Sequence, residues 1–294
     1  MRSIRTLAIA ALAMAPLAAV ADHHGDKAKA AAADPVLVEV VAGDWRGDEA
    51  KARDRYRHPV ESLTFWGLKP GMAILEIQPG GASWWTEILA PYAKRTGGSF
   101  AATGADLANP NLSEGARKSR AAFEERYGSK PDLYGNVQVV NWGATSRTLP
   151  EGRYDFILTA RSIHGWMQDK PGTVEATFAE FHKALKPGGI LAVEQHRANP
   201  LPAGAAENPA SGYVSEAYVI ALAEKAGFKL AARSEINANP KDTKDHPFGV
   251  WTLPPALRSS PYGSGKPDDP NFDHSKYLSI GESDRMTLKF VKAK

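Results

Sequence analysis

The chain has 294 residues, of which 43% are hydrophobic and 23% are charged, and its formal net charge is +3 at neutral pH. This composition is typical of a globular protein with enough apolar residues for one substantial core. The nearly balanced charge, without a concentrated basic face, argues against nucleic-acid binding. The sequence has no cysteine, which excludes disulfides and a lipid-anchoring cysteine.

The first 21 residues have the three-part pattern of a secretory signal peptide. Arg2 and Arg5 form a short basic region, residues 7–20 are apolar and alanine-rich, and Ala19-Val20-Ala21 matches the small-x-small cleavage pattern. The apolar run is short for a membrane span. We therefore expect residues 1–21 to be a cleaved signal peptide. The mature chain would have a net charge of +1, no membrane span, and a periplasmic or secreted location.

Residues 22–34 are rich in Ala, Lys, Asp and His and are expected to form a flexible leader. Cleavage after Ala21 would give a chain that begins Asp22-His23-His24, with a free amine and a histidine in third place. That arrangement suits square-planar Cu(II) or Ni(II), and a solvated polar leader is the alternative. No other metal-ligand spacing is present, so no metal site is predicted in the domain that follows.

From residue 35 onward, short apolar runs alternate with segments of helical period. The expected helices span 35–56 (interrupted at Gly43 and Gly47), 59–66, 84–92, 113–127, 174–185 and 215–226. The expected strands span 72–77, 99–103, 137–140, 154–159, 190–194, 229–233 and 286–291. This alternation predicts an α/β fold with a doubly wound, Rossmann-like parallel sheet.

The last part of the chain breaks the alternation. Residues 237–283 are rich in Pro, Gly, Asn and Asp and have little periodicity. They are expected to form a long surface excursion, which is unusual enough to suggest function or disorder. Because no helix joins the two strands that flank this segment, those strands are expected to pair antiparallel at the end of the sheet. No second core is evident, so residues 35–294 are expected to form one domain.

The end of the first strand is the expected ligand site, because open parallel sheets bind ligands beyond the carboxyl ends of their strands. There the chain runs from Glu76 through Gln78, Gly80 and Gly81, and its small residues allow close approach of a ligand. Asp106 follows the second strand, where an acidic side chain can accept the hydroxyls of a ribose. The alternative is that the glycines only make a tight turn and that Asp106 only caps a neighbouring residue.

Three segments resemble class I S-adenosylmethionine-dependent methyltransferases. They are Ile74-Leu75-Glu76-Ile77, Tyr154-Asp155-Phe156-Ile157-Leu158 and Leu185-Lys186-Pro187-Gly188-Gly189-Ile190-Leu191. The chain further resembles the family of exported bacterial predicted methyltransferases over residues 35–294. That resemblance rests on the stretches Phe65-Trp66-Gly67-Leu68-Lys69-Pro70-Gly71-Met72, Thr86-Glu87-Ile88-Leu89-Ala90-Pro91, Ala226-Gly227-Phe228-Lys229-Leu230 and Asp284-Arg285. It implies a seven-stranded sheet with an antiparallel final strand, S-adenosylmethionine as cofactor, and a role for Glu76 in binding it.

Two departures from the family pattern are evident. Gln78 and Ala82 replace the outer glycines of the usual Gly-x-Gly-x-Gly turn, and their Cβ atoms limit how closely a cofactor can approach. The family's acidic residue after strand three is also missing, and Trp142 stands in its place. Trp142 either stacks on the adenine of the cofactor or is a core residue.

Two histidines are candidates for catalysis. His164 follows the fourth strand and His196 follows the fifth, and either one could act as a general base. A hydrogen-bonded loop histidine is the alternative for each. Arg161 and Arg197 could pair with an acidic group of a substrate or form surface salt bridges.

The leading functional hypothesis is methyl transfer from S-adenosylmethionine to a small molecule or an envelope component. The alternative is an exported, non-catalytic binding or scaffold protein, since S-adenosylmethionine is produced inside the cell and the glycine turn is altered. A nicotinamide-dependent oxidoreductase is disfavoured because the chain lacks Gly-x-Gly-x-x-Gly. The acceptor and the oligomeric state stay open.

Overall fold

A computed structural model describes residues 32–143, 145–202 and 204–294. The expected signal peptide and the Asp22-His23-His24 motif lie outside the described residues. The described chain contains one seven-stranded sheet with the order β3-β2-β1-β4-β5-β7-β6. Its strands are β1 (Ala73–Ile77), β2 (Ser99–Ala105), β3 (Gln138–Trp142), β4 (Tyr154–Ala160), β5 (Leu185–His196), β6 (Phe228–Ser234) and β7 (Arg285–Lys292).

Only β7 runs against the other strands. The pairs β1–β2, β1–β4, β2–β3 and β4–β5 are parallel, whereas β7 pairs antiparallel with both β5 and β6. The expected Rossmann-like mixed sheet with an antiparallel last strand is therefore confirmed. Strand β7 is inserted between β5 and β6, so the free edge on this side is β6. The β5–β7 register places His196 opposite Arg285.

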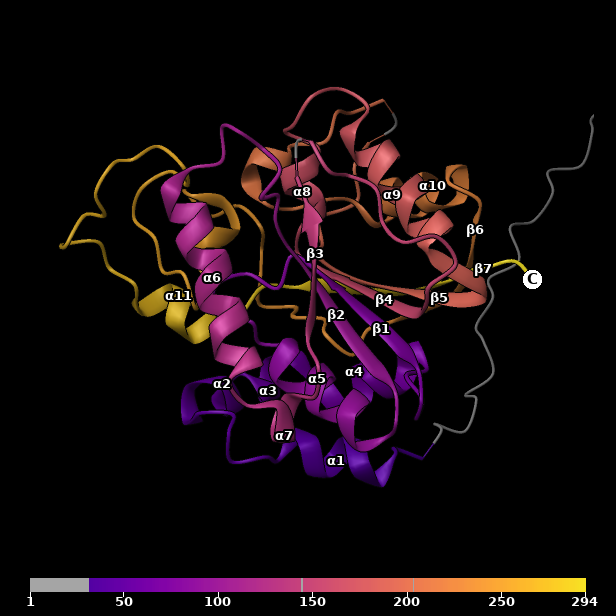
Figure 1. Ribbon diagram of the computed structural model, residues 1–294. Helices are drawn as coiled ribbons and strands as arrows, with labels where there is room; N and C mark the ends of the chain where they lie inside the picture. The colour runs from indigo at the N-terminus through magenta and orange to yellow at the C-terminus, as the bar shows by residue number, and fades with distance from the viewer. Residues whose placement is uncertain (1–31, 144, 203) are drawn as a thin grey trace, which may run out of the picture. The chain divides into compact units, whose positions relative to one another are not determined.

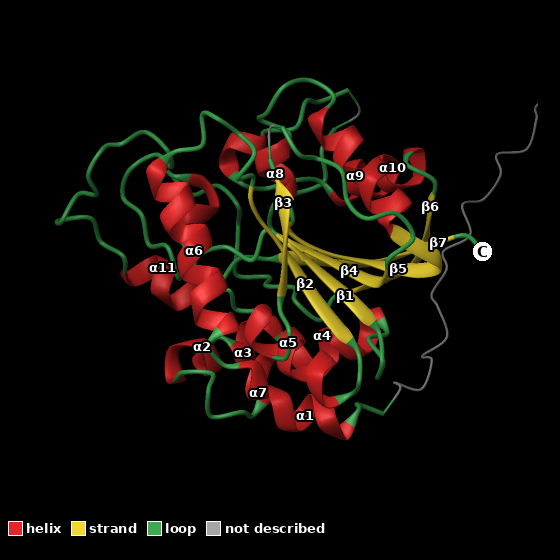
Figure 2. Ribbon diagram, viewed as in Figure 1, coloured by secondary structure: helices red, strands yellow, loops and turns green. Residues whose placement is uncertain are grey.

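Helices cover both faces of the sheet, as Figures 1 and 2 show. One face carries α1 (Pro35–Val41), α4 (Pro59–Trp66), α5 (Thr86–Arg95) and α7 (Pro131–Tyr134), and α2 (Asp48–Ala52) and α3 (Asp54–Arg57) lie beside them. The other face carries α9 (Thr173–Ala184) and α10 (Glu216–Lys225). Helices α6 (Glu114–Gly128), α8 (Ile163–Trp166) and α11 (Ser275–Ile280) lie towards the carboxyl ends of the parallel strands.

The alternation of side chains along each strand divides the core into two halves. Leu75 and Ile77 of β1 belong to the half beneath α9 and α10. Ile74 belongs to the half beneath α1, α4 and α5. Glu76 shares the side of Ile74, because residues two apart on a strand point to the same face. The buried carboxyl of Glu76 therefore faces the helices formed by the first part of the domain.

Local sequence explains several helix boundaries. Asp34 accepts a hydrogen bond from the Val36 N–H at 2.9 Å, and Pro35 occupies the first turn of α1. Ser113 caps α6 in the same way through the Ala116 N–H. The short helices α7, α8 and α11 were not expected, since four to six residues are too few to show a helical period.

The segment 237–283 between β6 and β7 is more ordered than its composition suggests. It contains the 3₁₀ helix η2 (Gly249–Thr252) and α11, and a second 3₁₀ helix, η1 (Pro209–Ser211), lies earlier in the chain. Several polar side chains of the segment 237–283 are buried, and they hydrogen-bond to one another and to neighbouring parts of the domain. Asp242 accepts hydrogen bonds from Tyr213 at 3.0 Å and from the Asp284 N–H at 2.8 Å, and His246 Nε2 lies 2.9 Å from its Oδ1. Part of this segment thus packs against the domain at the carboxyl end of the sheet.

Candidate functional site

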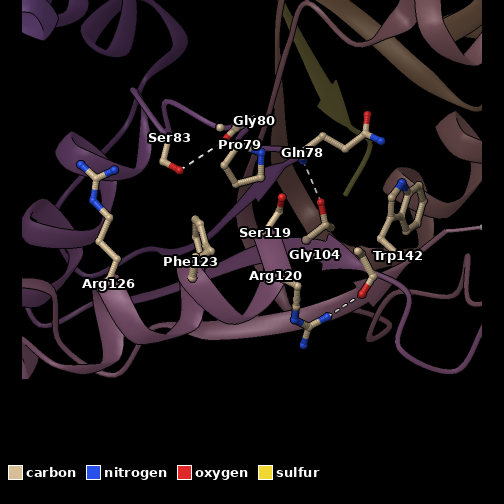
Figure 3. Close-up of a pocket in the computed structure, with 14 residues that line it drawn as sticks. Gln78, Pro79, Gly80, Ser83, Gly104, Ser119, Arg120, Phe123, Arg126 and Trp142 are labelled. Carbon is tan, nitrogen blue, oxygen red and sulfur yellow. Dashed lines mark hydrogen bonds between the residues drawn. The ribbon is translucent and has the colours of Figure 1, made fainter. Parts of the chain in front are cut away.

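A cavity of about 500 Å³ lies at the carboxyl ends of β1 and β2, against α6 (Figure 3). This volume is within the range of roughly 300–1,000 Å³ that is usual for small-molecule sites. The wall comes from the turn after β1, the end of β2, one face of α6 and the last residue of β3. The lining residues are Gln78, Pro79, Gly80, Gly81, Ser83, Thr103, Gly104, Ala105, Ser119, Arg120, Ala122, Phe123, Arg126 and Trp142.

In the turn after β1, Gln78 stands where the family pattern has a glycine, and hydrogen bonds hold both its backbone and its side chain. Gln78 has a left-handed backbone with a φ of 50°, and its N–H donates to the Thr103 hydroxyl at 2.7 Å. Its side-chain oxygen accepts a hydrogen bond from Trp166 Nε1 at 3.0 Å. Gly80 and Gly81 have no atom within 4 Å of the position where a Cβ would stand. The turn therefore leaves open space beside these two glycines.

Trp142 belongs both to the cavity wall and to the core. Its side chain is buried and its ring lies 6.0 Å from Phe181 with an interplanar angle of 23°. Within the described residues, its indole Nε1 has no hydrogen-bond partner. A buried donor without an acceptor is costly, and because this nitrogen has almost no accessible surface, the part of Trp142 that lines the cavity is its ring.

Glu76 and Asp106 do not line the cavity. The Glu76 carboxyl is buried and accepts a hydrogen bond from the Thr86 hydroxyl at 2.6 Å, and burial raises its pKa to about 8. Asp106 Oδ1 accepts from the Ala108 N–H at 3.1 Å, and its Oδ2 accepts from the Thr145 N–H and hydroxyl. These bonds, first that from the Thr145 hydroxyl, lower the pKa of Asp106. Ser146 is a fourth donor, so the roughly four lone-pair sites of this buried carboxylate are already used within the protein.

The two histidines predicted from the sequence lie close together. His164 is in α8, just beyond β4, and His196 is the last residue of β5. Their ring centroids are 5.9 Å apart, and the ring of Trp251 lies 5.6 Å from that of His164. The segment 237–283 thus supplies one wall of the histidine site.

Hydrogen bonds of Gln195 fix the tautomer of His164. The Gln195 side-chain oxygen accepts the Ile163 N–H at 3.2 Å, so its other end is the NH₂ group. That nitrogen donates to the Gly212 carbonyl at 2.9 Å and lies 3.2 Å from His164 Nδ1. His164 Nδ1 is therefore an acceptor, and the neutral ring carries its proton on Nε2. Burial lowers the pKa of His164 to about 4, so the ring is neutral at pH 7.

His196 has the more strongly lowered pKa of the two histidines. Its Nδ1 lies 2.6 Å from the Ser283 hydroxyl, which leaves Nε2 as the second ring nitrogen. Burial, followed by the charges of His164, Arg161, Arg285 and Arg57, lowers the pKa of His196 well below its ordinary value. The imidazole is therefore neutral at pH 7, the state in which it can accept a proton.

The two arginines named from the sequence have different surroundings. Arg197 pairs with Glu235 at 2.7 Å and with Asp284 at 2.9 Å, so it is engaged within the protein. Arg161 forms no salt bridge with another described residue, and its Nε is buried without a partner. Its backbone is left-handed, with a φ of 60°. Only Arg161 is thus available to a ligand.

Sequence reasoning missed the charged residues around Arg161. They are Arg53, Arg57, Glu194, Glu282 and Arg285, which come from α2–α3, β5 and the start of β7. Asp284-Arg285 was noted only as part of a family resemblance. A signal was present in the cationic residues 51–57, which contain four Lys or Arg, but nothing in the sequence places them beside β5.

No helix among residues 32–143, 145–202 and 204–294 is long and apolar enough to span a membrane. The same residues contain no group of three or more His, Asp or Glu side chains that could hold a metal ion.

Comparison with known proteins finds the fold but no family. No family model matches the chain, and no curated protein matches it. The [4+2]-cyclase SpnF has a similar structure, with a TM-score of 0.53 and 16% identity over 87% of this chain and 92% of that one. A SAM-dependent methyltransferase from Aquifex aeolicus matches with a TM-score of 0.46 and 19% identity over 68% of this chain and 93% of that one.

A third solved structure contains ligands. It is the Burkholderia thailandensis 1,6-didemethyltoxoflavin-N1-methyltransferase with bound 1,6-didemethyltoxoflavin and S-adenosylhomocysteine. Its TM-score is 0.44, and the identity is 15% over 88% of this chain and 85% of that one. At these identities the likeness is one of fold, and function has to be argued from the site.

Proposed function

We propose that the protein transfers a methyl group from S-adenosylmethionine to a small-molecule or envelope acceptor. The observation that carries this proposal is the cavity at the ends of β1 and β2, with open space beside Gly80 and Gly81 and the ring of Trp142 in its wall. The histidine pair lies beyond the neighbouring strands β4 and β5. The cavity and the histidines thus flank the β1–β4 junction, where strand order reverses and α/β sheets bind ligands.

The residues of the cavity fit the cofactor. The turn from Gln78 to Gly81 would hold its amino-acid end and Trp142 would contact the adenine, whereas Asp106, outside the cavity and bonded to Ala108 and Thr145, is not placed to accept from the ribose. Glu76 supports this turn through its bond to Thr86 at the start of α5. The cofactor supplies an activated methyl group, so the protein mainly has to align the acceptor and exclude water.

The two histidines have separate roles in this proposal. His164 presents an Nε2–H that can donate to the acceptor and orient it. His196 takes the proton that the acceptor loses as it gains the methyl group; in this role it would carry its own proton on Nδ1, which lies beside the Ser283 hydroxyl, and accept at Nε2. Trp251, whose ring packs on His164, would shield the reacting groups from water. The non-catalytic alternative gains no support from the structural neighbours.

Binding of S-adenosylhomocysteine, measured by isothermal titration calorimetry, tests the cofactor site. Gly81→Leu would place a side chain in the open space beside the turn without forcing a left-handed backbone. We expect wild-type protein to bind and Gly81→Leu to lose binding by at least tenfold. Gly115→Leu is the matched control, since Gly115 is an exposed α6 residue with equal space around it and does not line the cavity. Absence of binding to wild-type protein at millimolar ligand would overturn the proposal.

We also propose that the protein is exported and belongs with the exported methyltransferases that its sequence resembles. Support comes from the basic, apolar and small-residue pattern of residues 1–21. Mass spectrometry of protein from the periplasmic or culture fraction should find a chain that begins at Asp22. Full-length chain confined to the cytoplasm would contradict export and leave the catalytic proposal intact.

A further inference from the structure

A buried cluster of six charged side chains lies beside the histidine pair. Glu282 accepts from Arg53 Nε at 2.6 Å and from Arg57 Nε at 3.0 Å, and Arg285 Nη1 lies 3.1 Å from its carboxylate. Arg285 Nη1 also lies 2.8 Å from one carboxylate oxygen of Glu194. The other oxygen of Glu194 accepts a hydrogen bond from the indole N–H of Trp85 at 3.2 Å. This network joins α2 and α3 to β5 and β7.

The cluster has an excess of positive charge. Its four guanidinium groups, including that of Arg161, face only two carboxylates, those of Glu194 and Glu282. The excess formal charge is therefore +2. Glu76 does not offset it at pH 7, because burial raises the pKa of Glu76 to about 8. Uncompensated charge in a protein interior is costly, so the cluster favours an anionic partner.

Buried guanidinium nitrogens of the cluster also lack hydrogen-bond partners. Within the described part of the chain, Nη1 and Nη2 of Arg57, Nη2 of Arg53 and Nε of Arg161 have none. Arg57 has 0% exposed surface, and its guanidinium lies 4.8 Å from the ring centroid of Trp84. Stacking on an aromatic face engages the cation but leaves the in-plane N–H groups for an acceptor.

The cluster lies where an acceptor would bind. Arg161 directly follows β4, and its N–H donates to the Glu194 carbonyl at 2.8 Å. His196 follows Glu194 by two residues on the same face of β5, and it pairs in register with Arg285. Arg161 and His58, which follows Arg57, both have left-handed backbones, with φ of 60° and 40°. Strained backbone of this kind is concentrated at ligand sites.

We infer that the acceptor carries an oxyanion, a carboxylate or a phosphate, which the guanidinium groups of Arg57 and Arg161 bind beside His164 and His196. The planar guanidinium fork matches the geometry of either oxyanion. Partly exposed Arg161 forms the outer side of this site and buried Arg57 the inner side. This inference rests on the proposed methyl transfer in one respect, which is that the bound oxyanion is taken to belong to the methyl acceptor.

The test is the melting temperature of mature protein with sodium phosphate or sodium acetate, each compared with sodium chloride at equal ionic strength. We expect one or both oxyanions to raise the melting temperature of wild-type protein, because ligands of the native state stabilise it. Arg161→Gln should weaken the apparent affinity by about tenfold or more, as expected for loss of charge-assisted hydrogen bonds. A response to phosphate alone identifies a phosphate group, and a response to acetate alone a carboxylate.

Arg95→Gln is the control variant. Arg95 forms an exposed pair with Glu39 at 3.3 Å at the amino end of the sheet, and its loss should leave the oxyanion response unchanged. No oxyanion-specific response in wild-type protein, or an equal response in Arg161→Gln, would overturn the inference. Titration with S-adenosylhomocysteine on the same samples separates the two proposals. Cofactor binding without an oxyanion response refutes only this inference, and the converse refutes only the methyltransferase proposal.

Discussion

The side-chain amide of Gln195 lies 3.2 Å from Nδ1 of His164 and holds this histidine in a single tautomer. The amide cannot rotate by half a turn, because its oxygen already accepts the Ile163 N–H. His164 is thereby a hydrogen-bond donor at Nε2, so in the proposed reaction the role of base falls to His196. Burial, in turn, lowers the pKa of His164 to about 4 and keeps the ring neutral under physiological conditions.

Nitrogen NMR should show this tautomer directly. We expect His164 to carry its proton on Nε2 at pH 7 and to titrate near pH 4, since burial disfavours the charged ring. Gln195→Leu removes the fixed donor and should give a mixture of tautomers. Gln168→Leu is the control, because exposed Gln168 bonds the backbone oxygens of His164 and Pro209 and not the imidazole ring. A pKa near 6.5 in wild-type protein would refute this account.

Glu76 should give the stability of the protein a pH dependence. Its native pKa of about 8 lies above the unfolded value of 4.5, so the unfolded chain loses its proton first as the pH rises. The stability contributed by the protonated carboxyl is complete below about pH 4.5 and is lost between pH 4.5 and 8. Relative to wild type, Glu76→Gln should gain on the order of 4 kcal/mol in unfolding free energy across that interval.

Urea denaturation at pH 5 and pH 8 measures this difference. Exposed Glu39 provides the control, and Glu39→Gln should follow wild type at both pH values. If the unfolding free energy changed by the same amount between pH 5 and pH 8 in Glu76→Gln and in wild type, Glu76 would be ionised in the native protein.

Two tryptophans near the turn after β1 allow a matched comparison. The Trp142 N–H has no partner among the residues described, whereas the Trp166 N–H donates to Gln78 at 3.0 Å. Both Trp→Phe changes remove part of a buried ring, but Trp142→Phe breaks no described hydrogen bond and should cost less unfolding free energy than Trp166→Phe. Because Trp142 lines the cavity, Trp142→Phe should weaken S-adenosylhomocysteine binding by roughly two- to tenfold. Trp166→Phe should destabilise the protein by about 1 kcal/mol. Calorimetry measures the affinity for S-adenosylhomocysteine, and urea denaturation measures the unfolding free energy. Equal affinity in Trp142→Phe and wild type would exclude a contact between Trp142 and the cofactor.

Glu87 should be important for stability although it has no part in the proposed chemistry. Its buried carboxylate accepts from Arg126 at 2.6 Å, Tyr127 at 2.9 Å and Tyr134 at 2.7 Å. Glu87→Ala removes the acceptor from three donors and should cost about 3–5 kcal/mol of unfolding free energy. Glu39→Ala, at an exposed pair, should change it by less than about 0.5 kcal/mol. A loss below about 1 kcal/mol for Glu87→Ala would mean that this network contributes little.

The fold and the strand ends were predictable from the sequence because they depend on local pattern. Runs such as 72–77 and 154–159 are short and apolar, and each is followed by glycine or by polar residues. Their alternation with helical segments predicts a parallel sheet, and a parallel sheet brings its strand ends together. The closeness of His164 and His196, at 5.9 Å, follows from β4 and β5 being neighbours.

The partners of individual side chains were not predictable in this way. The sequence places Asp106 and Glu76 at strand ends, but it does not reveal that Thr145 and Thr86 donate to them. Likewise, Trp142 was equally consistent with the core and with a cofactor contact. Its ring packs on Phe181, as a core residue does, and the residue also lines the cavity.

The amino-acid sequence by itself determined the alternation of elements, the position of the glycine turn and the two histidines, because each depends on residues close together in the chain. Only the tertiary structure decided which charges lie together. Arg57 and Glu282 are 225 positions apart, yet they are paired at 3.0 Å inside the protein. Hydrophobic period sets where elements begin and end, whereas the partners of a buried charge depend on the packing of distant elements. The cationic cluster beside the histidines therefore became visible only in the folded chain.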